Sequence, residues 1–211
     1  MSRKKSSKAW LQRHVSDPYV RQAQQKGYRA RAAFKLIEIL QGQRLLRKGN
    51  IVVDLGATPG SWSQVVREHL LEENGQINGR IIALDMLPME PIDGVDFILG
   101  DFREQEVLDE LEALLAGQKV DLVLSDMAPN LSGIAVADAA RIEHLNELAL
   151  DFAREHLRPE GTLIAKTFHG RGYAQIVEAF KKQFRRVQAR KPESSRDRSA
   201  ETYLVGQHLK T

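Results

Sequence analysis

The chain contains no cysteine, so neither disulfide bridges nor thiolate metal sites contribute to its stability or chemistry. No hydrophobic run approaches the roughly 20 residues that a membrane-spanning helix needs, so we expect no membrane partner. The basic N-terminus lacks the apolar stretch of a secretory signal, which makes a cytoplasmic protein the expectation. None of the six histidines belongs to an H-E-x-x-H pattern, and we expect no metal.

Acidic residues are almost missing from the first 48 residues, which carry thirteen Lys and Arg side chains against Asp17 and Glu38. Residues 49–180 have the opposite balance, with nine basic and twenty-three acidic side chains, and residues 181–198 return to eight basic against two acidic ones. Two basic blocks around an acidic centre favour a polyanionic partner, most simply nucleic acid. For either block alone, a solvated surface is the alternative.

The remaining composition is that of an ordinary globular protein, with 42% hydrophobic and 28% charged residues. At 211 residues the chain is long enough for one full α/β domain, which we assign to residues 31–211. Residues 1–30 are expected to form a basic N-terminal arm with a short helical segment at 10–25, interrupted at Asp17-Pro18.

Strand-like and helix-like segments alternate along the rest of the chain without internal repeats. The expected strands are 51–55, 80–85, 95–100, 120–126, 162–168, 186–190 and 202–207. The expected helices are 31–40, 61–73, 104–116, 137–157 and 173–184. This alternation predicts an α/β fold with a doubly wound sheet, and segment 127–136 reads as a loop.

The first expected strand leads into a glycine turn, in the sequence Ile-Val-Val-Asp-Leu-Gly-Ala-Thr-Pro-Gly-Ser-Trp at 51–62. Continuous apolar residues indicate a strand buried on both faces, and ligands of such sheets bind beyond the carboxyl ends of the strands. Gly56 and Gly60 would let the backbone approach a ligand closely. The G-x-x-x-G spacing differs from the dinucleotide fingerprint G-x-G-x-x-G, and no Walker lysine follows. It resembles the first motif of S-adenosylmethionine-dependent methyltransferases; an ordinary glycine turn is the alternative.

Acidic residues end each of the first four expected strands, at Asp54, Asp85, Asp101 and Asp126. In an open α/β sheet these positions converge on one crevice. Asp85 is the candidate to accept hydrogen bonds from ribose hydroxyls, and Asp101 is the candidate for an exocyclic amine such as that of adenine. One such aspartate alone would as easily cap a loop, but four in phase indicate a ligand site.

Lys166 stands in an otherwise apolar strand, where a charged side chain is costly unless it is paired or neutral. A lysine that snorkels at a strand end is the alternative. The segment Ser-Asp-Met-Ala-Pro-Asn at 125–130 lacks the Asn-Pro-Pro-aromatic arrangement of enzymes that methylate amino groups of bases. An aromatic platform for a flipped base is therefore not expected there.

Four residues that are far apart in the sequence make the resemblance specific. Lys35 lies in Ala-Phe-Lys-Leu, Asp126 in Ser-Asp-Met-Ala-Pro-Asn, Lys166 in the fifth strand and Glu201 in Ser-Ala-Glu-Thr-Tyr. With them the chain resembles the FtsJ/RrmJ family of ribosomal RNA ribose 2′-O-methyltransferases, and they match the Lys-Asp-Lys-Glu tetrad of that family. The similarity runs over about residues 10–206.

The resemblance implies a Rossmann-like class I methyltransferase fold, with a mostly parallel seven-stranded sheet and helices on both faces. It implies S-adenosyl-L-methionine as cofactor and a uridine ribose in the A loop of 23S ribosomal RNA as substrate. We expect a monomer that acts on the assembled large ribosomal subunit. The expected cofactor contacts are Gly60, Trp62, Asp85, Asp101 and Asp126; for Trp62, a place in the hydrophobic core is the alternative.

A ribose hydroxyl is a poor nucleophile at neutral pH, so the enzyme must align it for in-line displacement and remove one proton. Lys166 is the candidate that takes or orients this proton. A neutral Lys166 could act as a base, whereas a charged one would stabilise the developing alkoxide, and the sequence leaves both roles open. Asp126 would hold Lys166, while Lys35 and Glu201 would fix the hydroxyl.

Other functional classes stay open on the sequence alone. The missing G-x-G-x-x-G disfavours a nucleotide-dependent oxidoreductase, and the intact tetrad disfavours a non-catalytic RNA-binding assembly factor. An enzyme that methylates another RNA ribose, or a base, is the nearest alternative. Three features depart from the family pattern: the turn Ala-Thr-Pro-Gly-Ser at 57–61, a longer linker at 71–79, and His169 where glutamine is more typical.

Overall fold

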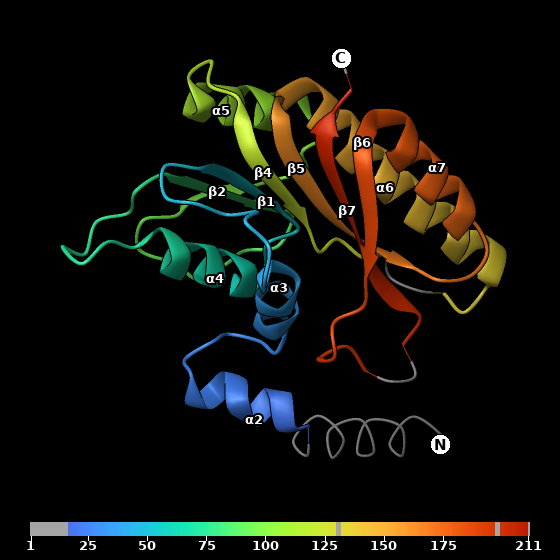
Figure 1. Cartoon of the computed structure of the whole chain (residues 1–211), viewed down its shortest axis with the longest axis horizontal. Coiled ribbons are helices and arrows are strands. Elements are labelled where there is room, and N and C mark those ends of the chain that lie inside the picture. Colours follow the sequence, from blue (N-terminus) through green and yellow to red (C-terminus); the bar gives the residue numbers. More distant parts are fainter. Residues whose placement is uncertain (1–16, 130–131, 197–198, 211) are drawn as a thin grey trace.

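One sheet of seven strands runs through the structure, with helices packed against both of its faces (Figure 1). This computed structural model of the chain describes residues 17–129, 132–196 and 199–210. The strands are β1 Ile51–Leu55, β2 Arg80–Asp85, β3 Asp96–Leu99, β4 Val120–Ser125, β5 Leu157–Phe168, β6 Phe184–Arg190 and β7 Glu201–Leu209. Their order is β3-β2-β1-β4-β5-β7-β6, in which β7 runs antiparallel to both neighbours and the other pairings are parallel. The predicted doubly wound, mostly parallel sheet is confirmed.

The helices divide between the two faces because each presents an apolar stripe to the sheet. They are α2 Pro18–Gln25, α3 Ala32–Leu40, α4 Ser61–Leu70, α5 Gln105–Leu115, α6 Ala135–His156 and α7 Tyr173–Gln183. α3 and α4 bury Leu36 and Val65 in the hydrophobic cluster on one face. α5, α6 and α7 bury Leu111, Phe152 and Phe180 in the cluster on the other (Figure 1).

The central strands are buried on both sides, as their continuous apolar sequences predict. In β1, Val53 packs into one cluster and Val52 into the other, because successive side chains of a strand point to opposite faces. β2 divides Ile82 and Ile81 in the same way. The polar residues that follow these strands therefore lie at the carboxyl ends of the strands, outside the two hydrophobic clusters.

The register of the last strands decides which residues meet at that edge. β4 pairs with β5 so that Ser125 faces Ala165, which places the next residues of both strands side by side. β5 pairs with β7 so that Lys166 faces Tyr203. Gly206 lets β7 lie close beneath Phe184, since a Cβ at this glycine would stand 2.4 Å from the Phe184 ring.

Several element boundaries differ from the predicted ones for local reasons. β5 begins at Leu157 instead of 162, because Leu157 already pairs with Val120 ahead of a register shift across the Pro-Glu-Gly sequence. α4 ends at Leu70 instead of 73, because Leu71 forms an isolated bridge with Ile77. α6 begins two residues early, at Ala135, where the Asp138 carboxylate accepts bonds from the two backbone amides of residues 132 and 133.

The N-terminal region is described from residue 17 onward. Asp17 caps α2 by accepting a 3.0 Å bond from the Tyr19 amide, and Pro18 occupies the first turn, where a proline is tolerated. The first part of the predicted helical segment 10–25, and residues 1–16 of the predicted basic arm, lie outside the described residues. Among the helices that are described, none is long and apolar enough to cross a membrane.

Candidate active site

The carboxyl ends of β1, β2, β4 and β5 surround a cavity of about 470 Å³. Residues of turns and of strand ends line this cavity, among them Gly56, Asp85, Asp101, Asp126 and Lys166. Three of the four acids predicted to converge there thus share one cavity. The fourth, Asp54, lies beneath it in the interior of the sheet and is fully buried.

Asp85 joins the turns that follow β1 and β2. One carboxylate oxygen accepts a 2.8 Å bond from the Thr58 amide, and the other accepts a 2.8 Å bond from the Leu87 amide. The Thr58 hydroxyl also donates to the Leu87 carbonyl oxygen at 2.9 Å. Each Asp85 oxygen keeps a further lone pair, so this carboxylate is fixed by backbone amides and can still accept bonds from a ligand.

Asp101 is held by its neighbour Arg103. The Arg103 backbone amide and Nε both donate to Asp101 Oδ1, at 3.0 and 2.9 Å. Hydrogen bonds from the Arg103 side chain hold the pKa of Asp101 below its ordinary value. Asp101 is therefore a carboxylate of the cavity that is charged at neutral pH.

Two of the predicted cofactor contacts, Gly60 and Trp62, are not among the residues that line this cavity. Trp62 is 2% exposed, its indole Nε1 donates to the Ala32 carbonyl at 2.9 Å, and its ring lies 5.5 Å from that of Tyr203. The structure places it in the hydrophobic core, the alternative considered from the sequence. A Cβ on Gly60 would meet Met89 Sδ at 2.7 Å, so Gly60 faces the chain after β2.

Asp54 is a buried carboxyl at the end of β1. Its Oδ2 accepts a 2.7 Å bond from the Ser63 hydroxyl, while Oδ1 is buried and has no hydrogen-bond partner among the described residues. Burial raises its pKa from the ordinary value of 3.8 to about 7, and the nearby charges of Asp126 and Asp85 act in the same direction. Asp54 therefore carries a proton over much of the acidic pH range.

The four residues of the expected tetrad form two ion pairs. Lys166 Nζ lies 2.9 Å from Asp126 Oδ1 and also donates to the Asp126 carbonyl oxygen. Lys35 Nζ lies 2.7 Å from Glu201 Oε1. Lys166 is only 9% exposed. Its ion pair with Asp126 meets the requirement that a charged side chain in an apolar strand has a partner.

Tyr203, which was not predicted as a site residue, connects the two ion pairs. Its hydroxyl donates to Asp126 Oδ1 at 2.8 Å, and Lys35 Nζ stands 5.9 Å from the centre of its ring. Burial raises the Tyr203 pKa well above its ordinary value, and the charges of Asp126 and Glu201 raise it further. Tyr203 is thus a neutral donor. The sequence pattern that could have identified Tyr203 is its spacing from Glu201: residues two apart in a strand lie on the same face of the sheet.

Glu201 is positioned by the segment that precedes β7. The Ser195 hydroxyl donates to Glu201 Oε1 at 3.0 Å. The neighbouring Ser194 donates its amide to both carboxylate oxygens of Glu38, at 3.2 and 3.1 Å, and accepts a bond from Arg31 on its carbonyl oxygen. Polar contacts from α3 and its N-cap therefore anchor this segment beside the tetrad.

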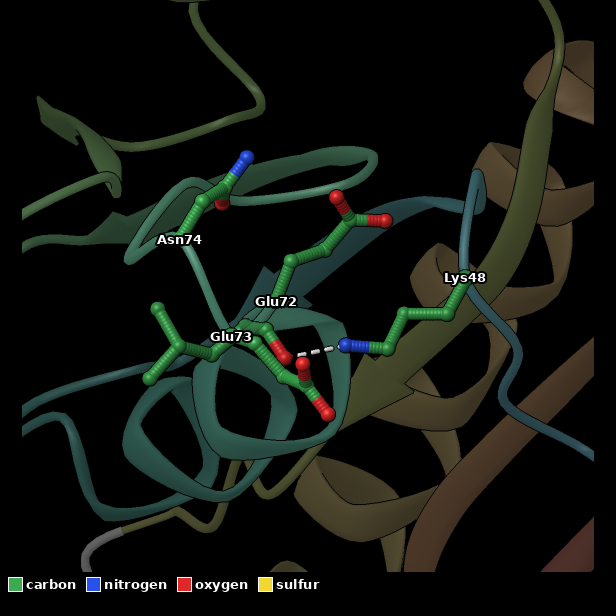
Figure 2. Close-up of a pocket in the computed structure, with 5 residues that line it drawn as sticks. Lys48, Glu72, Glu73 and Asn74 are labelled. Carbon is green, nitrogen blue, oxygen red and sulfur yellow. Dashed lines mark hydrogen bonds between the residues drawn. The ribbon is translucent and has the colours of Figure 1, made fainter.

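A second hollow, of about 540 Å³, lies at the opposite end of the sheet, between the chain before β1 and the chain after α4 (Figure 2). Lys48, Glu72, Glu73 and Asn74 line it together with Leu71, and the Lys48 ammonium donates to the Leu71 carbonyl oxygen. Its charged side chains project from the chain surface and none is buried. It carries no chemistry comparable to that of the cavity at the carboxyl ends of the strands.

Metal-ligating side chains do not gather in the part of the chain that the structure describes. No three His, Asp or Glu residues within it lie close enough together to hold a metal ion.

Comparison with known proteins places this geometry in a family. The model of the FtsJ-like methyltransferase family matches residues 28–209. The chain is 63% identical over 211 residues to ribosomal RNA large subunit methyltransferase E of Bordetella petrii, covering 100% of both chains. It is 59% identical over 217 residues to the protein of the same name from Paraburkholderia xenovorans, covering 100% of this chain and 99% of that protein.

Solved structures give the same result. A ribosomal RNA methyltransferase from Plasmodium falciparum superposes with a TM-score of 0.76 at 32% identity, over 86% of this chain and 98% of that one. Fibrillarin from Aeropyrum pernix, with bound S-adenosyl-L-methionine, superposes with a TM-score of 0.57 at 15% identity, over 85% of this chain and 75% of that one, and shows the fold alone. On its sequence and its fold, this chain belongs to the FtsJ-like methyltransferase family.

Proposed function

We propose that this protein transfers a methyl group from S-adenosyl-L-methionine to the 2′-hydroxyl of a uridine ribose in the A loop of 23S ribosomal RNA. The observation that carries the proposal is the presence of two neighbouring ion pairs, Lys166–Asp126 and Lys35–Glu201. Tyr203 lies between them: its hydroxyl donates to Asp126, and its ring centre lies 5.9 Å from Lys35 Nζ. The close full-length relatives are named as methyltransferases of large-subunit ribosomal RNA, which supports this substrate.

The cavity suits S-adenosyl-L-methionine in size and in chemistry. About 470 Å³ falls within the usual range of small-molecule sites, roughly 300–1,000 Å³. Asp85 and Asp101 offer acceptors for ribose hydroxyls and an adenine amine, and the exposed side chains of Met86 and Leu87 offer an apolar wall. At Gly56 a Cβ would stand 2.7 Å from Met127 Cγ, so this glycine lets the turn after β1 lie directly against Met127, another residue that lines the cavity.

The reaction forms a bond between the ribose oxygen and a methyl carbon and releases the hydroxyl proton. The bound cofactor supplies the methyl group on a sulfonium, which is already a good leaving group. The protein's residues must therefore hold the hydroxyl in line and stabilise the charge that develops on its oxygen.

Lys166 is the group we assign to that oxygen. Two Asp126 acceptors hold its amine, an arrangement suited to an ammonium, which has three donors and no acceptor. The third donor stays available for the ribose oxygen. We therefore favour the charged role of Lys166: it stabilises the developing negative charge, and the proton leaves to water as the new bond forms.

Lys35 and Glu201 form the other side of the acceptor site. Both side chains are only partly exposed, and their 2.7 Å ion pair fixes a positive and a negative group next to the Tyr203 ring. A ribose offers a hydroxyl donor to Glu201 and an oxygen acceptor to Lys35. Recognition of such a hydroxyl favours RNA over DNA, because DNA has none at the 2′ position.

The RNA would be bound largely through its phosphates. Lys191 is exposed directly after β6, at the end of the sheet edge where β7 begins with Glu201, because Arg190 pairs with Tyr203. Arg185 and Arg186 are exposed at the other end of β6. Phosphate contacts of this kind weaken as salt is raised. We infer that a monomer acts in the cytoplasm on the assembled large subunit, since the chain offers little separate surface for recognising free RNA.

The test is to map ribose methylation of large-subunit RNA in cells that lack this protein, and after the wild type or Lys166→Ala is restored. We expect one 2′-O-methylated uridine to disappear and to return with the wild type alone. Loss of a base methylation, or an unchanged ribose pattern, would refute the proposal. Assays on intact subunits and on protein-free RNA then decide the substrate, and equal turnover on both would overturn the preference for the particle.

A further inference from the structure

The chain between β2 and β3, residues 86–94, forms one wall of the cavity through Met86 and Leu87. These two side chains are 65% and 62% exposed, so the wall has little hydrophobic packing of its own to hold it. We propose that Arg29 is a positioning residue for the cofactor, which fixes this 86–94 loop against the glycine turn after β1. The inference rests on the proposed function, because it concerns the cofactor side of the same site.

The Arg29 guanidinium binds main-chain oxygens from two turns that are distant in sequence. Its Nη1 donates to the Pro59 carbonyl at 2.9 Å and to the Glu90 carbonyl at 2.6 Å, and its Nη2 donates to the Pro91 carbonyl at 2.8 Å. Pro59 belongs to the glycine turn, while Glu90 and Pro91 belong to the 86–94 loop. A planar fork of donors is suited to joining carbonyls in this way, and a charged donor makes the stronger bonds.

Arg29 is itself anchored to α4, so its side chain starts from a fixed point. The Arg29 amide donates to Gln64 Oε1 at 2.9 Å, and Gln64 Nε2 donates to the Gly27 carbonyl at 3.0 Å. The Tyr28 hydroxyl donates to Glu68 Oε2 at 2.5 Å. Arg29 and the two residues before it are thus tied to one helix, α4.

Gly60 provides the space for this arrangement. A Cβ at Gly60 would stand 2.9 Å from Arg29 Nη1, 2.7 Å from Met89 Sδ and 2.8 Å from Ile92 Cδ1. The guanidinium and two side chains of the 86–94 loop therefore converge directly over this glycine, which also has φ +103°. The structure gives Gly60 a role in seating the loop.

The 86–94 loop affects the cofactor site because hydrogen bonds link the loop to Asp85 and to the glycine turn. Leu87 donates its amide to Asp85 and accepts the Thr58 hydroxyl on its carbonyl. Arg67 holds the far end of the loop by donating from Nε to the Asp93 carbonyl at 2.6 Å. Without Arg29 the middle of the loop would lose two hydrogen bonds and its link to Pro59 of the glycine turn, so the apolar wall and the Asp85 carboxylate would no longer be held in one geometry.

Arg29 lies in the basic N-terminal region, so the alternative role for its side chain is a contact with an RNA phosphate. The two roles have different consequences. A phosphate contact weakens RNA binding and leaves cofactor binding unchanged, whereas the loop-fixing role raises the cofactor Kd in the absence of RNA. Arg21, an exposed arginine on α2, is the matched control for loss of one positive charge from the same region.

The experiment compares the wild type, Arg29→Gln, Arg29→Lys and Arg21→Gln. Calorimetry gives the Kd for S-adenosyl-L-methionine without RNA, and amide hydrogen exchange of the cofactor-free chain follows residues 86–94. We expect Arg29→Gln to raise the Kd about tenfold or more and to speed exchange in the loop. Arg29→Lys, which keeps the charge but loses the fork, should raise it less. Arg21→Gln should change neither, and both Gln variants should weaken binding of an A-loop RNA fragment equally.

An unchanged cofactor Kd and unchanged loop exchange in folded Arg29→Gln would overturn the inference, and a larger loss of RNA binding than in Arg21→Gln would assign Arg29 to phosphate. Should Arg29→Gln fail to fold, Arg29→Lys decides by the same two readouts. Asp85→Ala separates this from failure of the proposed function. If that variant also binds the cofactor like the wild type, the cofactor site itself is wrongly assigned.

Discussion

The two halves of the candidate site are built in different ways. On the cofactor half, the ends of β2 and β3 carry Asp85 and Asp101. Backbone amides of two turns fix Asp85, and the backbone amide and side chain of Arg103, two residues along the chain, fix Asp101. On the acceptor half, Lys166 and Glu201 are fixed by ion pairs between different strands and helices. The cofactor half is thus determined mainly by local turn geometry, and the acceptor half by tertiary structure. Substitutions in the two halves should therefore change different quantities.

The largest effect is expected for Lys166→Ala, in the acceptor half. Loss of the charge beside the ribose oxygen should lower kcat about 10³-fold, while the Kd for the cofactor stays within about twofold of the wild-type value. Single-turnover kinetics and calorimetry measure the two quantities. Lys119→Ala, which removes an exposed lysine that donates to the Glu155 carbonyl, is the control and should leave both unchanged.

Lys166→Arg sharpens this result. Arginine keeps the positive charge and cannot act as a base. Turnover above that of Lys166→Ala supports the charged role, whereas equal loss in both variants indicates that Lys166 takes the proton.

The next effect is expected for Asp85→Ala, in the cofactor half. Removing an acceptor for ribose hydroxyls should raise the cofactor Kd by about 10- to 100-fold, which corresponds to roughly 1.5–3 kcal/mol. At saturating cofactor, kcat should change far less. Asp96→Ala, at the start of β3, is the control, because Asp96 lies at the other end of that strand and pairs with Arg80. A kcat defect without a change in Kd would contradict the division into halves.

A smaller loss is expected for Tyr203→Phe. The variant keeps the buried ring and removes the hydroxyl that donates to Asp126, so kcat should fall about tenfold. The cofactor Kd should remain near the wild-type value, because the hydroxyl acts on the acceptor half. A raised Kd with an unchanged kcat would mean that Tyr203 serves the cofactor half.

The last effect concerns stability instead of catalysis or cofactor binding, and it acts through Asp54. Its pKa is raised from 3.8 to about 7 in the folded protein, so the folded state binds this proton more tightly than the unfolded state does. The associated stability is complete below about pH 4 and is lost as the pH rises towards 7. We therefore expect the free energy of unfolding of the wild type, minus that of Asp54→Asn, to fall over this range by at most about 1.4 kcal/mol per pH unit.

Urea denaturation of both proteins at several pH values measures this difference. Asp54→Asn is the reference because all other groups titrate in both proteins, so their contributions cancel in the difference between the two free energies of unfolding. A difference that is constant or rises between pH 4 and pH 7 would show that Asp54 is not protonated in the folded protein.

The difference between local turn geometry and tertiary contacts also explains which parts of the molecule could be predicted from the sequence. The doubly wound sheet follows from the alternation of strand-like and helix-like segments, and the acids at strand ends are local patterns that can be read directly, as Asp85 and Asp101 show. Tetrad residues such as Lys35 were identified through family resemblance, because nothing local shows that Lys35 meets Glu201, which stands 166 positions later. Tyr203 was missed for the same reason, since its contact with Asp126 depends on the register of β7.

Two other positions show contacts that a local pattern does not reveal. The family resemblance made Trp62 and Gly60 expected cofactor contacts, with the hydrophobic core as the alternative for Trp62. The Trp62 indole instead finds its acceptor on Ala32, and the space at Gly60 is shared with Arg29 and Met89. In both cases a partner from before β1 or after β2 determines the orientation, and such partners are not visible in a short motif.

The insertion of β7 between β5 and β6 has a consequence for how the enzyme is made. Because Glu201 and Tyr203 belong to the final strand, a growing polypeptide carries the cofactor cavity's turns long before it holds a complete acceptor site. If Glu201 has the role proposed above, methyl transfer begins only after almost the entire chain has been translated and β7 has paired with β5 and β6.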